Sequence, residues 1–244
     1  PAEPAQPAAP VIAAPSGPTL QVLAYTMDEQ THTITADDGT ELITGESAYP
    51  VVTLANKAAE AKINEHFAEE KRDFDEDLQE YADDARALIA ERGAQDFPTF
   101  GYTVTHSSAR CDSVVASFIE DSYVYLAGAH GTATREGVTF DMATGDTLEL
   151  EDIVTVSEDE AEKFVLDYLL TALQQPQYTE LGLFDDYAQY LPEIVEEDGC
   201  FYLTNEGVMI VINDSFIASH AAGLIEVPIP YADFTILKGE YLPQ

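Results

Sequence analysis

The 244-residue chain has no tryptophan, only two cysteines, and ten Lys plus Arg against 46 Asp plus Glu. The formal charge of −36 at neutral pH creates a field of one sign that repels nucleic acid and anionic lipid and attracts cationic proteins or divalent metals. Acidity of this kind also serves solubility alone. Because the sequence contains no run of about 18 apolar residues, we expect no membrane insertion by this segment. Nucleic acid is excluded as a partner on charge.

The two cysteines, Cys111 and Cys200, each lie at the edge of an expected strand. In an oxidising compartment, a disulfide between them would close a loop of about 90 residues and contribute about 4–5 kcal/mol on chain-entropy grounds. The sequence does not fix the distance between their Cα atoms. The sequence is therefore equally compatible with a disulfide between the two cysteines and with two separate thiols.

Residues 1–18 are rich in Pro and Ala, carry one charge at Glu3, and lack the apolar periodicity that a core requires. This composition predicts an extended, semi-rigid tether. The chain begins with Pro1 rather than Met, which indicates that the original N-terminus has been removed. A spacer in this position suits a protein tethered upstream, and the sequence leaves open whether a lipid anchor, a signal peptide or a membrane helix precedes it. The remaining residues are ordinary in hydrophobic content and long enough to form one large or two small domains.

Apolar residues recur at steps of three, four and seven between about 57 and 92, which predicts one long helix. The residues on this face are Ile63, Phe67, Phe74, Leu78, Tyr81, Ala85 and Leu88. Gly93 is the expected C-cap. At about 1.5 Å per residue the helix would be about 54 Å long, so it must lie across a sheet or protrude beyond it.

Shorter alternating segments flank this helix and predict strands. They cover residues 20–26, 31–36, 41–44, 49–54, 100–106, 113–119, 122–127, 138–142, 146–150, 201–203, 208–212 and 226–229. A second helix is expected from Ser157, which has capping-box spacing to Glu160, up to Pro176, and a weaker helical stretch at 184–196. Because helices and strands come in blocks, the expected fold class is α+β, with antiparallel sheets packed by one long helix and one or two shorter ones.

His130 lies in a glycine-rich turn, Gly128 to Gly131, where an imidazole could act as a general base or metal ligand. No second His or Cys stands at ligand spacing, and no serine sits in a nucleophile-elbow pattern. A turn histidine that bonds local backbone is the simpler interpretation. His130 remains a candidate for a binding surface.

Tyr187, Tyr190 and Tyr202 surround the weaker helical stretch. Tyrosines bind sugars and protein hot spots alike, because one end of the ring is apolar and the other polar. Packing in a core without tryptophan is the alternative role for each of them. We treat the three as candidate binding residues.

Runs of carboxylates invite a calcium or glycosidase interpretation, but none has the spacing of an EF-hand loop. These runs are Glu149–Asp152, Glu158–Glu160, Asp185–Asp186 and Glu196–Asp198. A carboxylate pair can hydrolyse a glycosidic bond, yet sequence spacing cannot select a pair from 46 acidic residues. We expect no catalytic residue, no metal site and no cofactor.

Several motifs of the second half occur in a fixed order. They are YLAGAHG at 125–131, FDMATGDTLEL at 140–150, FYLTNEGV at 201–208 and AAGLIEVPIPY at 221–231. The series resembles the paired extracytoplasmic domains of the lysozyme-sensing anti-sigma factor RsiV and of the N-terminal region of the peptidoglycan deacetylase PdaC. The resemblance implies a first domain over residues 19–133 and a second over 134–238. The deacetylase motif Thr-Phe-Asp-Asp-Gly is absent, so deacetylase activity does not follow.

The resemblance implies a location outside the cytoplasm, either secreted or anchored at the bacterial cell envelope. Our hypothesis is a non-enzymatic binding module for a cationic protein such as lysozyme, or for cell-wall glycan (peptidoglycan). A wall-active hydrolase that uses paired carboxylates, and a structural envelope domain without a discrete ligand, are the alternatives.

Overall fold

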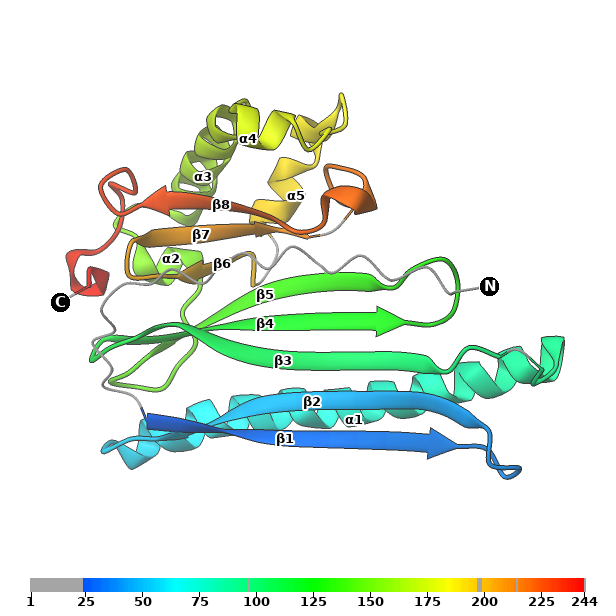
Figure 1. Ribbon diagram of the computed structural model, residues 1–244. Helices are drawn as coiled ribbons and strands as arrows, with labels where there is room; N and C mark the ends of the chain where they lie inside the picture. Colours follow the sequence, from blue (N-terminus) through cyan, green and yellow to red (C-terminus); the bar gives the residue numbers. More distant parts are fainter. Residues whose placement is uncertain (1–23, 96, 197–198, 214, 244) are drawn as a thin grey trace.

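The computed structural model describes residues 24–95, 97–196, 199–213 and 215–243. The expected tether at residues 1–18 and the first part of the expected strand 20–26 lie outside the described residues. Two units follow each other along the chain, and the second lies beside strand β5 of the first (Figure 1). The strands are β1 (Ala24–Thr35), β2 (Glu41–Thr53), β3 (Phe100–Cys111), β4 (Val115–Tyr125), β5 (Thr132–Asp141), β6 (Phe201–Leu203), β7 (Gly207–Ile212) and β8 (Ile225–Pro230).

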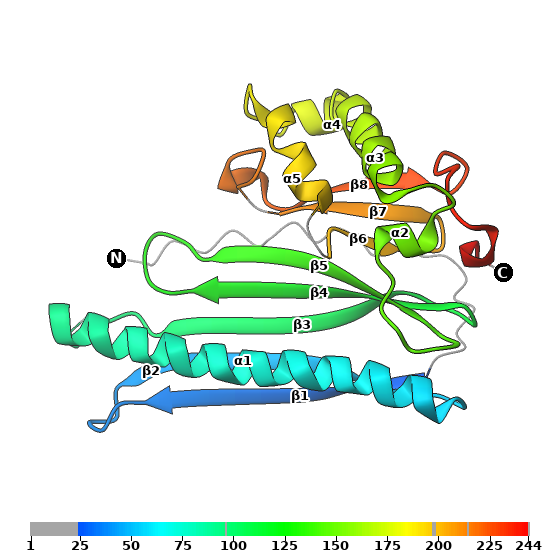
Figure 2. The ribbon, with the colours of Figure 1, turned by 180° about the vertical axis from the view of Figure 1, so that it is seen from behind.

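The helices lie on one side of the two sheets, the side seen in Figure 2. The α-helices are α1 (Lys57–Arg92), α2 (Leu150–Ile153), α3 (Glu158–Ala172), α4 (Pro176–Thr179) and α5 (Leu191–Glu196). The short 3₁₀ helices are η1 (Tyr187–Gln189), η2 (His220–Ala222) and η3 (Gly239–Tyr241). The α+β fold class is confirmed, and the weaker helical stretch expected at 184–196 is split between η1 and α5. In the described residues, no helix combines the length and the apolar character that a membrane span requires.

The first sheet has the order β1-β2-β3-β4-β5 and is mixed rather than purely antiparallel. β2 and β3 run parallel, from Ile43 opposite Phe100 to Ala48 opposite Thr105. The reason is α1, which carries the chain back along the sheet between these two strands. Pro50 is tolerated in β2 because it lies beyond the segment that pairs with β3, so its missing N–H removes no bond there.

Helix α1 begins and ends where the sequence predicts. The side chain of Asn56 accepts hydrogen bonds from the N–H groups of Ala58 and Ala59, and Gly93 ends the helix at a φ of 87°. The predicted apolar face packs on the first sheet. Gly45 in β2 permits this approach, since a Cβ there would lie 2.7 Å from the side chain of Leu78.

The first unit includes all of β5, so the expected boundary between residues 133 and 134 falls inside a strand. β5 pairs with β4 over ten residues, and Phe140 on β5 is fully buried among Phe67 and Phe118 of the first core. The chain leaves the first sheet only after Asp141. If β5 belonged to the second unit instead, β4 would lose its backbone hydrogen bonds on that side.

The second unit is a three-stranded antiparallel sheet, β6-β7-β8, covered by α3 and α5. Its core is mainly aliphatic, with Val165, Leu169 and Ile210 among the buried residues. Helix α3 begins with the predicted capping box between Ser157 and Glu160. The second unit therefore has a hydrophobic core of its own, and the loops between its short helices lie outside that core.

Two arginines of the first unit hold the second unit in place. Arg110 is fully buried; it forms an ion pair with Asp112 and donates to the carbonyl of Tyr241 at 2.6 Å. Arg135 donates to both carboxylate oxygens of Asp121 at 2.7 and 2.9 Å and to Glu226 of β8 at 2.9 Å. Charge-assisted bonds of this kind give geometric specificity, so the two units are fixed relative to each other.

Candidate functional site

His130 lies in the turn between β4 and β5, which two tyrosine hydroxyl groups organise. Tyr125 donates to the carbonyl of Gly128 at 3.3 Å, and Tyr123 accepts from the N–H of Gly131 at 3.2 Å. Gly128 has a φ of 109°, which a side chain would strain. The Nδ1 atom of His130 lies 3.0 Å from the carbonyl oxygen of Gly131, so the imidazole does contact local backbone.

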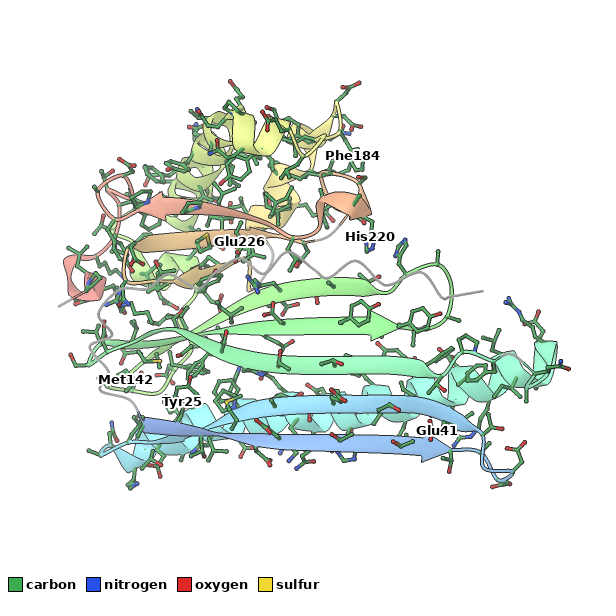
Figure 3. The ribbon with its side chains drawn as sticks, viewed as in Figure 1. Tyr25, Glu41, Met142, Phe184, His220 and Glu226 are labelled. Atoms are coloured by element: carbon green, nitrogen blue, oxygen red, sulfur yellow. The ribbon has the colours of Figure 1, made fainter. Side chains whose placement is uncertain are left out.

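The ring of His130 also stacks on His220, which belongs to η2 of the second unit. The ring centroids are 3.7 Å apart and the ring planes differ by 13°. Both histidines are exposed. His220 points from the second unit toward the β4–β5 turn (Figure 3). The expected lone turn histidine is therefore half of a pair that bridges the two units.

The chain between α4 and α5, residues 181–190, carries apolar side chains into solvent, and we call it the aromatic loop. Leu181, Phe184 and Tyr190 are 37%, 40% and 36% exposed. The Phe184 N–H donates to the carbonyl of Ile217 at 2.9 Å, and Leu183 forms a bridge with Ala218. These bonds place the loop directly beside the segment that leads to His220, at the same end of the molecule (Figure 3).

A groove of about 480 Å³ opens beside the aromatic loop. It is lined by Leu173, Gln174, Thr179, Leu183, Phe184, Asp185 and Tyr187. Tyr187 is half-buried and packs against the core of the second unit. Asp185 is exposed and lines the groove, and the exposed carboxylates Glu180 and Asp186 are next to its lining residues in the chain. We call the aromatic loop, residues 217–220 and the turn at 126–131 together the end surface.

The end surface joins three of the four candidate residues, since it contains His130, Tyr187 and Tyr190. Tyr202 is not part of it, because β6 turns this side chain into the contact between the two units. Tyr202 is only 5% exposed, and its hydroxyl donates to Glu226 at 2.6 Å. Burial raises the pKa of Tyr202, and the hydrogen bond to Glu226 raises it further. Its role here is packing and pairing rather than ligand binding.

Cys111 and Cys200 do not form a disulfide in the structure. Both are buried thiols; Cys111 lies in the core of the first unit and Cys200 in that of the second. Burial raises the pKa of Cys111 to about 12, which keeps this thiol protonated and unreactive at neutral pH.

A second, smaller groove of about 100 Å³ gathers carboxylates from separate acidic runs of the sequence. It is lined in part by Glu149, Glu151, Glu158, Glu162 and Glu196. Burial and then the neighbouring charges, Glu158 first, raise the pKa of Glu162. If the protein were a hydrolase with paired carboxylates, this acidic groove would be its candidate active site, because it brings several carboxylates together.

Sequence reasoning missed two members of the end surface, Phe184 and His220. A phenylalanine followed by Asp185 and Asp186 signals a position near solvent, and this could have singled out Phe184. Nothing in the sequence pairs His220 with His130, because the stacking depends on how the two units meet. The charge pattern was also available: no Lys or Arg occurs between Lys163 and Lys238, so the aromatic loop lies in a region without basic residues.

Comparison with known proteins gives two family matches and a shared fold. Residues 37–133 match the family model described as Deacetylase PdaC, and residues 151–232 match the model described as Protein of unknown function (DUF3298). No curated protein matches the chain.

Two solved structures have the same fold over nearly their whole length. A DUF3298 family member from Bacteroides fragilis is 19% identical with a TM-score of 0.68, covering 91% of this chain and 96% of its own. A DUF3298 family protein from Pseudomonas aeruginosa is 16% identical with a TM-score of 0.55, covering 91% of this chain and 97% of its own. Residues 37–133 are therefore similar to a PdaC-type domain and residues 151–232 to a DUF3298 domain, the pair that the sequence motifs indicated.

Proposed function

We propose that this protein is a non-enzymatic, extracytoplasmic binding module whose end surface binds a cationic protein of the lysozyme kind. The observation that supports this most is the aromatic loop, where Leu181, Phe184 and Tyr190 are held in solvent among carboxylates. Exposed aromatic side chains surrounded by polar residues are typical of protein-binding sites. The location at the cell envelope rests on the resemblance to RsiV and PdaC.

The charge of the surface favours a cationic partner over a neutral one. Glu180, Asp185 and Asp186 flank the aromatic loop, and the stretch from residue 164 to 237 contains no Lys or Arg to offset them. Such a field accelerates the encounter with a basic protein, whereas the buried aromatic contacts set how slowly the complex dissociates. A neutral cell-wall glycan would use the tyrosine rings and could donate hydroxyl hydrogen bonds to the carboxylates, but it would gain no long-range attraction from their charge.

The site is also pre-formed, which lowers the entropy that binding must offset. The backbone bond from Phe184 to Ile217 and the stacking of His220 on His130 connect the loop to both units. Arg135 and Glu226 fix the orientation of those units. A partner can therefore contact a surface whose parts already stand in place.

The test is binding of hen lysozyme, a strongly cationic probe, to the whole chain at low and at physiological salt. Screening weakens contacts between exposed charges at a Debye length of about 8–10 Å, while apolar contacts persist. We expect a component that resists salt. Phe184→Ala and Tyr190→Ala should each weaken that component by about 2 kcal/mol, roughly 30-fold, as for hot-spot residues.

The matched controls are Val51→Ala, which truncates an apolar side chain of β2 that is 45% exposed, and Glu76→Gln on the outer face of α1. Neither should change the salt-resistant affinity. Equal, small effects in all four variants would contradict the proposal and leave a structural role. Turnover of peptidoglycan fragments that disappears in Glu162→Gln would instead favour the hydrolase alternative.

A further inference from the structure

The first unit contains a buried histidine that two carboxylates approach beneath α1. The side chain of His106 on β3 has no exposed surface. Its Nε2 atom lies 3.1 Å from Oε2 of Glu70 on α1 and 3.2 Å from Oε2 of Glu120 on β4. One ligand atom from each of the three residues lies within 4.8 Å of the others. The cluster joins α1 to two consecutive strands, β3 and β4, in which Glu120 lies directly opposite His106.

The other ring nitrogen of His106 is already used. Its Nδ1 atom lies 3.1 Å from the carbonyl oxygen of Ala48, which can accept only from an N–H. The tautomer with its proton on Nδ1 leaves a lone pair on Nε2, facing the two carboxylates. Histidine ligands of metals are commonly oriented in this way, by a bond from the second nitrogen to a backbone carbonyl.

The contacts at the centre of the cluster are close but poorly aligned for hydrogen bonds. Within the described residues, neither His106 Nε2 nor Glu70 Oε2 has a partner with hydrogen-bond geometry, although both are fully buried atoms. An N–H at Nε2 would have to be shared between the two oxygens, as a three-centre bond. In a tetrahedral site, Zn–N and Zn–O bonds of about 2.0–2.2 Å place neighbouring ligand atoms about 3.3–3.6 Å apart, so the two distances from Nε2 would lengthen by only a few tenths of an ångström on metal binding.

The residues around the cluster support a metal centre as well. His66 Nε2 lies 2.9 Å from the other oxygen of Glu70, so that carboxylate is oriented from behind. Glu70 and Glu120 keep 26% and 23% of their side chains exposed, which gives an ion a path from solvent and room for a water ligand. Two carboxylates with a neutral imidazole would balance the charge of a divalent cation.

We propose that Glu70, His106 and Glu120 form a binding site for a divalent transition metal, with Zn²⁺ as the best match to one imidazole and two carboxylates. This departs from the sequence expectation of no metal site, and it does not depend on the proposed lysozyme-binding surface. The ion would connect α1 to β3 and β4 and so stabilise the first unit. The competing occupant is a proton on His106, held between the two carboxylates.

The experiment measures zinc binding by the whole chain after dialysis against chelator, in physiological salt with excess magnesium. These conditions suppress weak binding by exposed carboxylates. We expect one Zn²⁺ per chain, a rise in melting temperature on loading, and an affinity that falls by about tenfold or more in His106→Gln and in Glu120→Gln. Cobalt in place of zinc should give a visible spectrum that both variants lose.

The matched controls remove a histidine and a carboxylate elsewhere, as His32→Gln on β1 and Glu76→Gln on α1, and should keep the tight site. If His106→Gln does not fold, Glu120→Gln decides, since Glu120 is partly exposed and the change is isosteric. No stoichiometric zinc in the original chain, or unchanged affinity in the ligand variants, would overturn the proposal. The cluster would then be a protonated histidine paired with two carboxylates.

Discussion

The two units of this protein depart in opposite ways from the rule that apolar side chains are buried and ionisable ones exposed. The first buries a histidine, because His106 lies under α1 beside the phenylalanines of the core, with the two partly exposed carboxylates at its Nε2 atom. The second hides almost only aliphatic residues and instead exposes Phe184 and Tyr190 on a loop. Buried charge and exposed aromatic surface are both unfavourable unless something binds them. This difference is the basis of the two sites that we propose, an ion site in the first unit and a protein-binding surface in the second.

That comparison depends on the two units folding as one body, and the largest expected effect comes from Arg110. Arg110→Met leaves the carboxylate of Asp112 buried without its cation and removes the bond to Tyr241. Breaking one side of a buried pair lowers the free energy of unfolding by about 3–5 kcal/mol. Urea denaturation measures this directly.

A double variant, Arg110→Met with Asp112→Asn, is the control for the orphaned charge. It should recover part of the loss, since an Asn side chain still accepts from the N–H groups of Val114 and Val115. A loss below about 1 kcal/mol in the single variant, the size of an exposed ion pair, would show that Arg110 does not hold the units together.

The second prediction concerns a substitution that would push the two units apart where β5 packs against β6. A Cβ on Gly137 in β5 would lie 2.0 Å from the backbone oxygen of Phe201 in β6. Gly137→Ala should therefore lower the free energy of unfolding by about 1–3 kcal/mol, the range for overpacking, and broaden or split the thermal transition as the units come apart. Gly101→Ala in β3 is the matched control, because nothing lies within 4 Å of a Cβ there. Equal effects at the two positions would contradict close packing of β5 on β6.

The smallest expected effect concerns Tyr202. Tyr202→Phe removes the hydroxyl that donates to Glu226, a bond to a charged group that contributes about 1.5–3 kcal/mol at most. We expect the lower part of that range, because Arg135 still pairs with Glu226.

The same variant has a pH signature. The pKa of Tyr202 is raised in the folded protein, first by burial. Its contribution to stability is thus complete below the unfolded value of about 10 and is lost as the pH rises above it. Stability measured between pH 8 and 11 should fall less steeply in Tyr202→Phe than in the original chain. Parallel curves would show that the hydroxyl ionises as freely in the folded state as in the unfolded one.

The sequence predicted correctly those features that depend on interactions between residues close together in the chain. The spacing of Ile63, Phe67 and Phe74 predicted α1, and Gly93 predicted its end, because helix periodicity and capping depend on neighbours in the chain. The capping box at Ser157 worked for the same reason. The β2–β3 pairing was missed, since its parallel direction follows from how α1 crosses the sheet.

The sites were harder to predict because they combine distant segments. His130 was identified from its glycine-rich turn, but its partner His220 comes from the other unit. The sequence predicted Tyr202 as a binding residue, but in the structure its side chain is buried where the two units meet. Glu70 and Glu120 could not be distinguished from the other carboxylates by sequence, since the pairing of β4 with β3 places Glu120 opposite His106 and the packing of α1 on the sheet adds Glu70.

The most direct test of the division of function is amide hydrogen exchange on the whole chain with and without saturating hen lysozyme at physiological salt. The account predicts new protection in residues 181–190 and 217–220, with none along the outer face of α1. Protection confined to α1, where carboxylates are dense but apolar side chains are not exposed, would mean that lysozyme is held by charge alone. That result, or no protection anywhere, would contradict the assignment of a specific binding surface to the second unit.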